Sequence, residues 1–319
     1  MVELQFPDVH RDAELPERVT VYEVGPRDGL QAEVAMIPVE IKAEFCRRLI
    51  DAGIGTLEVT SFVSPKWVPQ LADAEDLMAR LQTTETLAAD RVRSVVLTPN
   101  MRGSVRALAA GAGEVAVFVS ATETFAEKNL NMTVAQAMEN AAAVIEHARA
   151  AGIAVRGYVS MCFGDPWEGR VPPTQVVEVA QRLFELGVQS VSLGDTIGVA
   201  TPGHVKVLLE QLLRAGVPAE RVAMHFHDTY GQALANVYAA LHCGIVEFDS
   251  SAGGLGRCPY AKGATGNLAT EDLVWMLHGL GIQTGIDLDA LVATTQWMSA
   301  HIGHPPASRV ATALIAANS

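Results

Sequence analysis

The segment Arg221-Val222-Ala223-Met224-His225-Phe226-His227-Asp228-Thr229-Tyr230-Gly231 decides how the chain is interpreted. Residues 222–227 have the pattern of a buried strand, and a turn then leads to a helix-like segment. Side chains two apart on a strand point to one side, so the rings of His225 and His227 should converge. Two imidazoles at the carboxyl end of a strand that leads to a helix are typical of a metal site in an α/β barrel. Taken alone, the motif fits two buried core histidines equally well, so the rest of the chain has to decide.

Strand-like and helix-like segments alternate along the whole chain. The expected strands cover residues 19–24, 56–62, 92–97, 114–120, 154–160, 190–193, 222–227 and 245–249. The expected helices cover residues 38–50, 71–81, 104–110, 133–151, 173–186, 202–215 and 232–243, and a further one begins near residue 270. Eight such units predict one closed (β/α)₈ TIM barrel. The alternative, a doubly wound sheet, would carry a Gly-x-Gly-x-x-Gly motif after its first strand, and none is present.

One catalytic domain is expected over residues 1–319. The barrel should occupy about residues 19–285, and extra helices should pack on it over about residues 286–319. No low-complexity linker divides the chain.

Composition excludes several classes of protein. The chain has 319 residues and a net charge of −13, which argues against nucleic acid as the main partner. No apolar run is long enough to span a bilayer, and residues 1–17 are polar, unlike a secretory signal. The four cysteines, Cys46, Cys162, Cys243 and Cys258, show no Cys-x-x-Cys spacing, which indicates a reduced compartment. We therefore expect a cytoplasmic protein.

Charged side chains stand at three expected strand ends. Asp28 and Arg27 follow the first strand, Asp195 ends the sixth in a Gly-flanked turn, and Asp249 ends the eighth. Glu58 lies inside the apolar second strand, where an unpaired carboxylate is costly, so it requires a cation such as Arg27 nearby. An Arg-Asp pair in a turn is more often an exposed surface pair, which is the competing interpretation.

A glycine-rich segment follows the eighth strand. It carries Gly253, Gly254, Gly256, Gly263 and Gly266, too many for a plain connector, and is a candidate lid. It also contains one thiol, Cys258, flanked by a proline. A lone cysteine is as often an inert core residue as a reactive one.

Several long motifs, in this order, resemble the 3-hydroxy-3-methylglutaryl-CoA lyases, metal-dependent enzymes on a TIM barrel. They are "VYEVGPRDGLQ" (21–31), "LEVTSFVSPKWVPQ" (57–70), "RGYVS" (156–160), "SLGDTIGVATPG" (192–203), "HFHDTYGQALAN" (225–236) and "GLGRCPYAKGATGNLATEDLVWML" (254–277). The resemblance covers about residues 19–287. Motifs of this length in this order are specific in a way that a single His-x-His is not.

The resemblance implies a set of site residues. It implies a divalent metal, Mg²⁺ or Mn²⁺, with the ligands Asp28, His225, His227 and Asn267. It places Arg27 against the thioester carbonyl and Cys258 as the catalytic thiol, with Glu58 and Asp195 as supporting carboxylates. Ser61 and Thr196, at two strand ends, would contact the substrate. The implied partner is an acyl-CoA, and a homodimer is expected.

The implied reaction is cleavage of 3-hydroxy-3-methylglutaryl-CoA to acetyl-CoA and acetoacetate, a step of leucine degradation. A base removes the C3 hydroxyl proton, and His225 and Asp28 are both candidates. The chain departs from the family pattern at three positions. Ala32 and Val34 stand where the family usually has Asn and Lys, and Arg257 replaces a glycine before the loop cysteine.

Three alternatives to this function stay open from the sequence. The first is a lyase for a related 3-hydroxy-3-substituted acyl-CoA. The second is a Claisen-type synthase that condenses acetyl-CoA with a 2-oxo acid; such enzymes commonly read His-x-His-Asn-Asp, where this chain has Asp228 and Thr229. The third is an inactive metal-stabilised scaffold, against which the complete set of site residues argues.

Overall fold

Eight parallel strands close into a barrel, so the predicted TIM barrel is confirmed. The computed structural model describes residues 7–88, 91–256 and 266–317. The strands follow one another around the barrel in the order β1, β10, β9, β8, β5, β4, β3, β2. Their bounds are β1 Thr20–Glu23, β2 Thr56–Ser61, β3 Arg93–Leu97, β4 Glu114–Ser120, β5 Ala154–Ser160, β8 Ser190–Asp195, β9 Val222–Phe226 and β10 Glu247–Ser250. Two short strands, β6 Gly164–Asp165 and β7 Gly169–Arg170, pair with each other in a separate hairpin.

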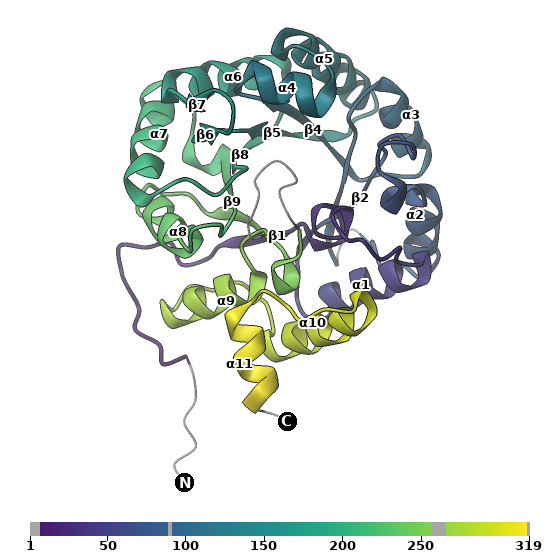
Figure 1. The fold of residues 1–319 in the computed structure, drawn as a ribbon, viewed down its shortest axis with the longest axis vertical. Coiled ribbons are helices and arrows are strands. Elements are labelled where there is room, and N and C mark those ends of the chain that lie inside the picture. Colours follow the sequence, from purple (N-terminus) through teal and green to yellow (C-terminus); the bar gives the residue numbers. More distant parts are fainter. Residues whose placement is uncertain (1–6, 89–90, 257–265, 318–319) are drawn as a thin grey trace.

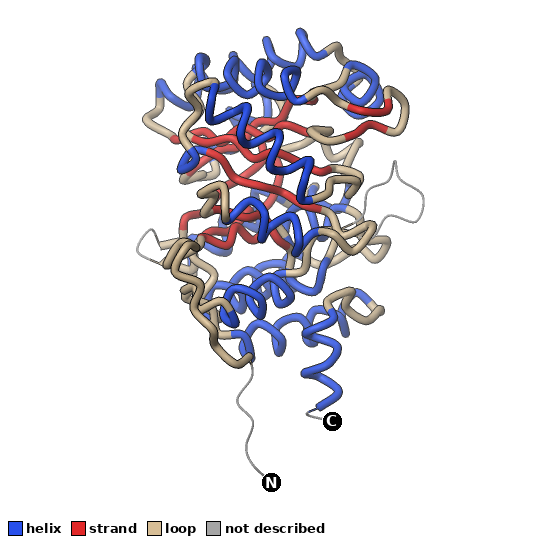
Figure 2. The backbone as a smooth tube through the Cα atoms, turned by 90° about the vertical axis from the view of Figure 1, so that its left-hand side faces the viewer, coloured by secondary structure: helices blue, strands red, loops and turns tan. Residues whose placement is uncertain are grey.

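Helices surround the barrel, and the strands lie inside the ring that they form (Figures 1 and 2). Their bounds are α1 Val39–Asp51, α2 Ala74–Thr83, α3 Met101–Ala109, α4 Glu123–Leu130, α5 Val134–Ala150, α6 Pro173–Leu186, α7 Pro202–Arg214, α8 Ala233–Leu241, α9 Thr270–Gly279, α10 Leu288–Ile302 and α11 Arg309–Ala317. Among the described residues, none of these helices combines the length and the apolar character needed to cross a membrane.

The strands are buried on both faces, and their side chains fill two different spaces. Val96 and Val115 belong to the large apolar cluster that includes the surrounding helices, whereas their chain neighbours Val95 and Ala116 belong to a small cluster with Tyr22. This division follows from the period of two along a strand. The small cluster lies inside the barrel, and charged side chains share that interior.

The sequence prediction was incomplete at some elements. Helix α3 begins three residues earlier than predicted, because Asn100 Oδ1 accepts the Gly103 backbone N–H at 2.9 Å and caps the helix. Helix α4 and the β6–β7 hairpin were not predicted. In α4 only Phe125 and Ala126 are buried, which is too few apolar positions to produce a helical period.

Helix α10 packs against α1 and α9, and α11 packs against α9 and α10, so the predicted fold with extra C-terminal helices is confirmed (Figure 1). The backbone N–H of Asp287, just before α10, donates to the Ala52 carbonyl at 2.8 Å. Gly53, which follows α1, approaches this segment so closely that a Cβ atom on it would lie 2.2 Å from the Gly285 carbonyl oxygen.

We expect Gly53→Ala to destabilise the fold far more than Gly152→Ala. Both glycines follow a helix within the tripeptide Ala-Gly-Ile, and both have left-handed backbone, with φ of 94° and 73°. Alanine costs roughly 1–2 kcal/mol in that conformation. At Gly152 nothing lies within 4 Å of the added methyl group. At Gly53 it meets the Gly285 oxygen, so the total loss should reach about 3 kcal/mol or more. Urea unfolding of both variants measures the difference, and equal losses would contradict the prediction.

Candidate metal centre and active site

Arg27 and Asp28 lie on a single tight turn after β1. This turn, η1 (Gly25–Gly29), is π-helical, and the Val24 carbonyl accepts the backbone N–H groups of Arg27, Asp28 and Gly29 at 3.1, 2.8 and 3.1 Å. Short π-helical turns are frequent at functional sites. The turn fixes where both side chains begin, at the carboxyl end of the barrel.

Arg27 is the cation that the buried Glu58 requires. Its Nε donates to Glu58 Oε2 at 2.6 Å, and its Nη1 donates to Asp28 Oδ1 at 2.6 Å. Glu58 is fully buried and Arg27 is 8% exposed, so this is not a surface ion pair. The Arg27 guanidinium also lies 5.7 Å from the centre of the Tyr158 ring. Burial alone would lower the pKa of Arg27, but Glu58 and Asp28 raise it above its ordinary value, so its charge is permanent.

Asp28, His225 and His227 bring possible ligand atoms within 4.8 Å of one another. The two rings stand at the carboxyl end of β9 with their centres 5.2 Å apart, as the spacing of two residues predicts. His227 Nδ1 is buried and has no hydrogen-bond partner among the described residues. A buried imidazole nitrogen without a partner fits a metal ligand.

Asn267 reaches the same place from the return of the glycine-rich segment. It pairs with His227 in an isolated antiparallel bridge. Its Nδ2 donates to Asp28 Oδ2 and to the Leu255 carbonyl, both at 2.9 Å. With both amide hydrogens engaged, the orientation of the amide is set, and Oδ1 is left buried without a described partner. Asn267 therefore offers an oxygen, the atom type that Mg²⁺ and Mn²⁺ prefer.

Two of the possible ligands, Asp28 and His227, are held in the protonation states that bind a cation. Burial alone would raise the pKa of Asp28, but the charges of Arg27 and His225 outweigh it and hold that pKa at about 2. Burial and, to a smaller extent, the charge of His225 lower the pKa of His227 to about 4. Burial would also lower the pKa of His225, but its hydrogen bond to Asp249 raises it. Asp28 is thus ionised and His227 neutral at neutral pH.

The Asp195 carboxylate accepts hydrogen bonds from the backbone of the turn that follows β8. Asp195 ends β8, which runs two residues further than predicted, and its carboxylate accepts the backbone N–H groups of Val199 and Ala200 at 2.9 and 3.1 Å. Burial nevertheless raises its pKa to about 6. The hydrogen bonds account for its burial, and a catalytic role for it stays a prediction.

The two residues predicted to contact substrate, Thr196 and Ser61, differ in whether their hydroxyl oxygen already has a hydrogen-bond partner. Thr196 Oγ1 accepts the backbone N–H of Met161 at 2.8 Å. Met161 is buried with a left-handed backbone, φ 59°, so this bond supports a strained residue at the end of β5. Ser61 Oγ is buried and has no partner among the described residues. Ser61 therefore has a hydroxyl to offer, and both roles stay predictions.

Cys258 and Arg257 lie outside the described residues, as does Gly263. The other three cysteines are free thiols: Cys46 and Cys162 are buried and Cys243 is half-buried. Burial raises the pKa of the Cys46 thiol to about 12 and also raises that of Cys162, so neither is suited to react.

The sequence analysis missed two buried glutamates that hold the loops around the site. Glu23 accepts backbone N–H groups from both η1 and η4 (Ala252–Gly254), at 2.7 and 2.9 Å. Glu271, on α9, accepts the Gly253 N–H at 3.0 Å and the Thr295 hydroxyl. Burial raises the pKa of each to about 7. The signal that identified Glu58, a charge inside an apolar strand, was present for Glu23. Glu271 stands in the first turn of α9, where an acidic side chain is common, so its position carried no such signal.

The sequence analysis also passed over Asp249, although it noted the residue at the end of the eighth strand. Asp249 is 1% exposed and lies beside His225, whose Nδ1 is 3.2 Å from its Oδ2. It is therefore part of the surroundings of the candidate metal centre.

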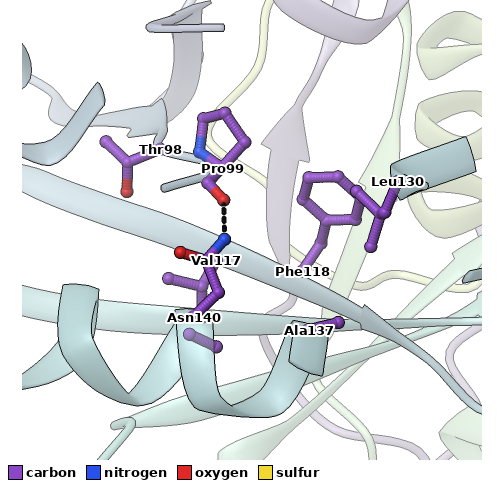
Figure 3. A pocket seen from close by; sticks show the side chains of 8 residues that line it. Thr98, Pro99, Val117, Phe118, Leu130, Ala137 and Asn140 are labelled. Carbon is purple, nitrogen blue, oxygen red and sulfur yellow. Dashed lines mark hydrogen bonds between the residues drawn. The ribbon is translucent and has the colours of Figure 1, made fainter. Parts of the chain in front are cut away.

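A small recess lies elsewhere, between the ends of β3 and β4 and the helices α4 and α5 (Figure 3). Asn140 Nδ2 crosses it to donate to the Pro99 carbonyl at 2.7 Å. Its lining residues are Thr98, Pro99, Val117, Phe118, Leu130, Ala137, Asn140 and Ala141. None of them is ionisable, so the recess offers no acid, base or metal ligand.

Comparison with known proteins agrees with this geometry. The chain is 50% identical over 300 residues to the mitochondrial hydroxymethylglutaryl-CoA lyase of Arabidopsis thaliana, covering 94% of this chain and 63% of that protein. The hydroxymethylglutaryl-CoA lyase of Pseudomonas aeruginosa has a similar structure, with a TM-score of 0.90, 48% identity and coverage of 95% of this chain and 99% of that one.

A third relative has been solved with ligands. An HMG-CoA lyase from Acinetobacter baumannii, in complex with coenzyme A and 3-methylmalate, matches with a TM-score of 0.88 and 36% identity, covering 95% of this chain and 97% of that one. The family model described as HMGL-like matches residues 18–298. The chain therefore belongs to the HMGL-like family.

Proposed function

We propose that the chain is a divalent-metal-dependent lyase that cleaves 3-hydroxy-3-methylglutaryl-CoA to acetyl-CoA and acetoacetate. The observation that carries this proposal is the convergence of Asp28, His225 and His227 beside the buried cation Arg27. The names of the similar proteins support the substrate, and the relative solved with coenzyme A supports an acyl-CoA ligand. Turnover of 3-hydroxy-3-methylglutaryl-CoA, measured with and without a chelator, tests the proposal directly.

The metal would be held by Asp28, His225, His227 and Asn267. A carboxylate, an amide oxygen and two imidazoles form a mixed set that suits Mg²⁺ or Mn²⁺. The buried atoms His227 Nδ1 and Asn267 Oδ1, which have no described partner, support this assignment. When bound, such a metal polarises the oxygen atoms of the substrate and lowers the pKa of its C3 hydroxyl.

The residues of the chain would divide the rest of the reaction among them. The C3 hydroxyl proton passes to a base, for which His225 and Asp28 are the candidates. The C2–C3 bond then breaks, and C3 becomes the ketone carbon of acetoacetate. The electron pair of the broken bond stays with C2 and forms the enolate of acetyl-CoA. Arg27 would stabilise the enolate oxygen, and Glu58 and Asp28 already orient its guanidinium. Cys258 would return a proton to C2.

A lyase for a related 3-hydroxy-3-substituted acyl-CoA is the second candidate. Val34 stands where the family usually carries a lysine, and it is 96% exposed, so an apolar side chain faces solvent at that position. Rates with longer-branched 3-hydroxyglutaryl-CoA analogues separate the two candidates. The predicted homodimer, the cytoplasmic location and the place in leucine degradation stay predictions.

His227→Ala should abolish metal binding and activity together while the fold survives. Loss of a residue that only hydrogen-bonds to a metal ligand typically weakens metal affinity about 10–100-fold, so loss of a ligand itself should weaken it more than about 100-fold. Isothermal titration of Mn²⁺ into the metal-free protein measures this loss. His278→Ala is the matched control, since His278 is a half-buried histidine on α9 bonded to Thr284. An inactive His227→Ala that retains full Mn²⁺ affinity would refute the ligand assignment.

Arg27→Gln should lower kcat by ~10²–10³ and change KM much less, because it removes a preorganised cation from a developing oxyanion. Steady-state kinetics measure both constants. Glu58 loses its partner in this variant, so the double variant Arg27→Gln, Glu58→Gln serves as control, with the buried pair neutral on both sides. It should fold and be equally slow. A change confined to KM would show that Arg27 only binds substrate.

Cys258→Ser should bind metal and substrate nearly normally and lose ~10²–10⁴ in kcat, the usual contribution of a positioned acid. A hydroxyl is a much weaker acid than a thiol at neutral pH. Iodoacetamide should inactivate the wild-type protein, with protection by substrate, while Cys46 and Cys162 react slowly because they are buried. Wild-type turnover by Cys258→Ser would assign the thiol no chemical role.

A further inference from the structure

We propose that Asp249 and Arg156 are positioning residues for the metal centre. Asp249 holds His225 with its Nδ1–H engaged and its Nε2 available to the metal, and Arg156 holds Asp249 in place. The inference rests on the metal site proposed above and extends it by two residues that are not among its ligands.

One carboxylate connects four neighbouring strands. Asp249 on β10 pairs in register with His225 on β9, and β8 and β5 follow next in the barrel. Asp249 Oδ1 accepts from Arg156 Nη2 at 2.5 Å, across from β5. Its Oδ2 accepts from Ser192 Oγ on β8 at 2.8 Å and from His225 Nδ1 at 3.2 Å. Both carboxylate oxygens of Asp249 therefore accept hydrogen bonds, and these bonds fix the orientation of the carboxylate.

Arg156 cannot turn away from Asp249 without leaving a buried charge unpaired. Its side chain is 0% exposed, and so is that of Asp249. Glu247 lies 3.1 Å from Nη1 on the other side, and the guanidinium lies 3.7 Å from the centre of the Tyr22 ring. Nη1 and Nε have no hydrogen-bond partner among the described residues, so the hydrogen bond to Asp249, the aromatic face and the nearby charge of Glu247 hold the guanidinium.

The arrangement sets which nitrogen of His225 can bind a metal. An ionised carboxylate only accepts hydrogen bonds, so His225 Nδ1 must carry the hydrogen. The lone pair is then on Nε2, the nitrogen that does not face Asp249. When Nε2 binds the metal, His225 has no lone pair left to accept a proton, so Asp28 is the candidate base that remains. A carboxylate behind a ligand histidine is a recurring device of metal sites and typically contributes about 10–100-fold to metal affinity.

The test is the Mn²⁺ affinity of Asp249→Asn, measured by isothermal titration on the metal-free full chain. The substitution preserves shape and removes the charge, and we expect Kd to rise about 10–100-fold. Asp73→Asn is the matched control, because it also breaks an ion pair with a buried cation, Asp73 to Lys42 at 2.8 Å, on the outside of the barrel. It should lose stability and keep its Mn²⁺ affinity.

The outcomes separate this inference from the metal site itself. A wild-type protein that does not bind Mn²⁺ overturns both. A folded Asp249→Asn with wild-type Kd overturns the positioning role and leaves the metal site standing.

If Asp249→Asn does not fold, nitrogen-15 NMR of histidine-labelled, Mg²⁺-loaded wild-type protein decides. The His225 signals are identified by their loss in His225→Gln. A hydrogen on Nδ1 of His225 supports the proposal, and a hydrogen on Nε2 overturns it.

Discussion

Charge buried inside the barrel is the constraint on which the site depends. Arg27, Glu58, Arg156 and Asp249 are all nearly or wholly buried. Moving an ion out of water costs several kcal/mol unless a partner of opposite charge compensates it. Each arginine therefore lies between two carboxylates, Arg27 between Glu58 and Asp28, and Arg156 between Asp249 and Glu247. These pairs restrict Asp28 and His225, so the possible ligands are held in place by the fold itself.

The site also requires that the two ends of the glycine-rich segment after β10 pack closely against each other. The sequence favours mobility as the reason for the glycines after β10, but two of the described ones have a steric role. A Cβ atom on Gly256 would lie 2.4 Å from Asn267 Nδ2, and one on Gly266 would lie 1.8 Å from the Gly256 carbonyl oxygen. Larger residues would push the two ends of the segment apart. Asn267 could then no longer reach Asp28 and the Leu255 carbonyl.

Local patterns were enough to predict the barrel and part of the site. The order of strands and helices follows from periods of two and of about 3.6 residues, which each segment carries within itself. The convergence of His225 and His227 needs only the period of a strand. The partnership of Glu58 and Arg27 could be inferred because a buried carboxylate has to find a cation. Helix α4 was missed because too few of its residues are buried and apolar to produce a helical period.

The sequence by itself thus determined the (β/α)₈ architecture, the pair of histidines on one strand and the need of Glu58 for a cation. Only the tertiary structure decided which side chains meet across the barrel. Arg156 and Asp249 are 93 residues apart, and they meet because β5, β8, β9 and β10 are neighbours in the closed sheet. The amide orientation of Asn267 depends likewise on Asp28, 239 residues away. The physical reason is that the strand stagger and closure of a barrel set these contacts, and both are properties of the whole sheet.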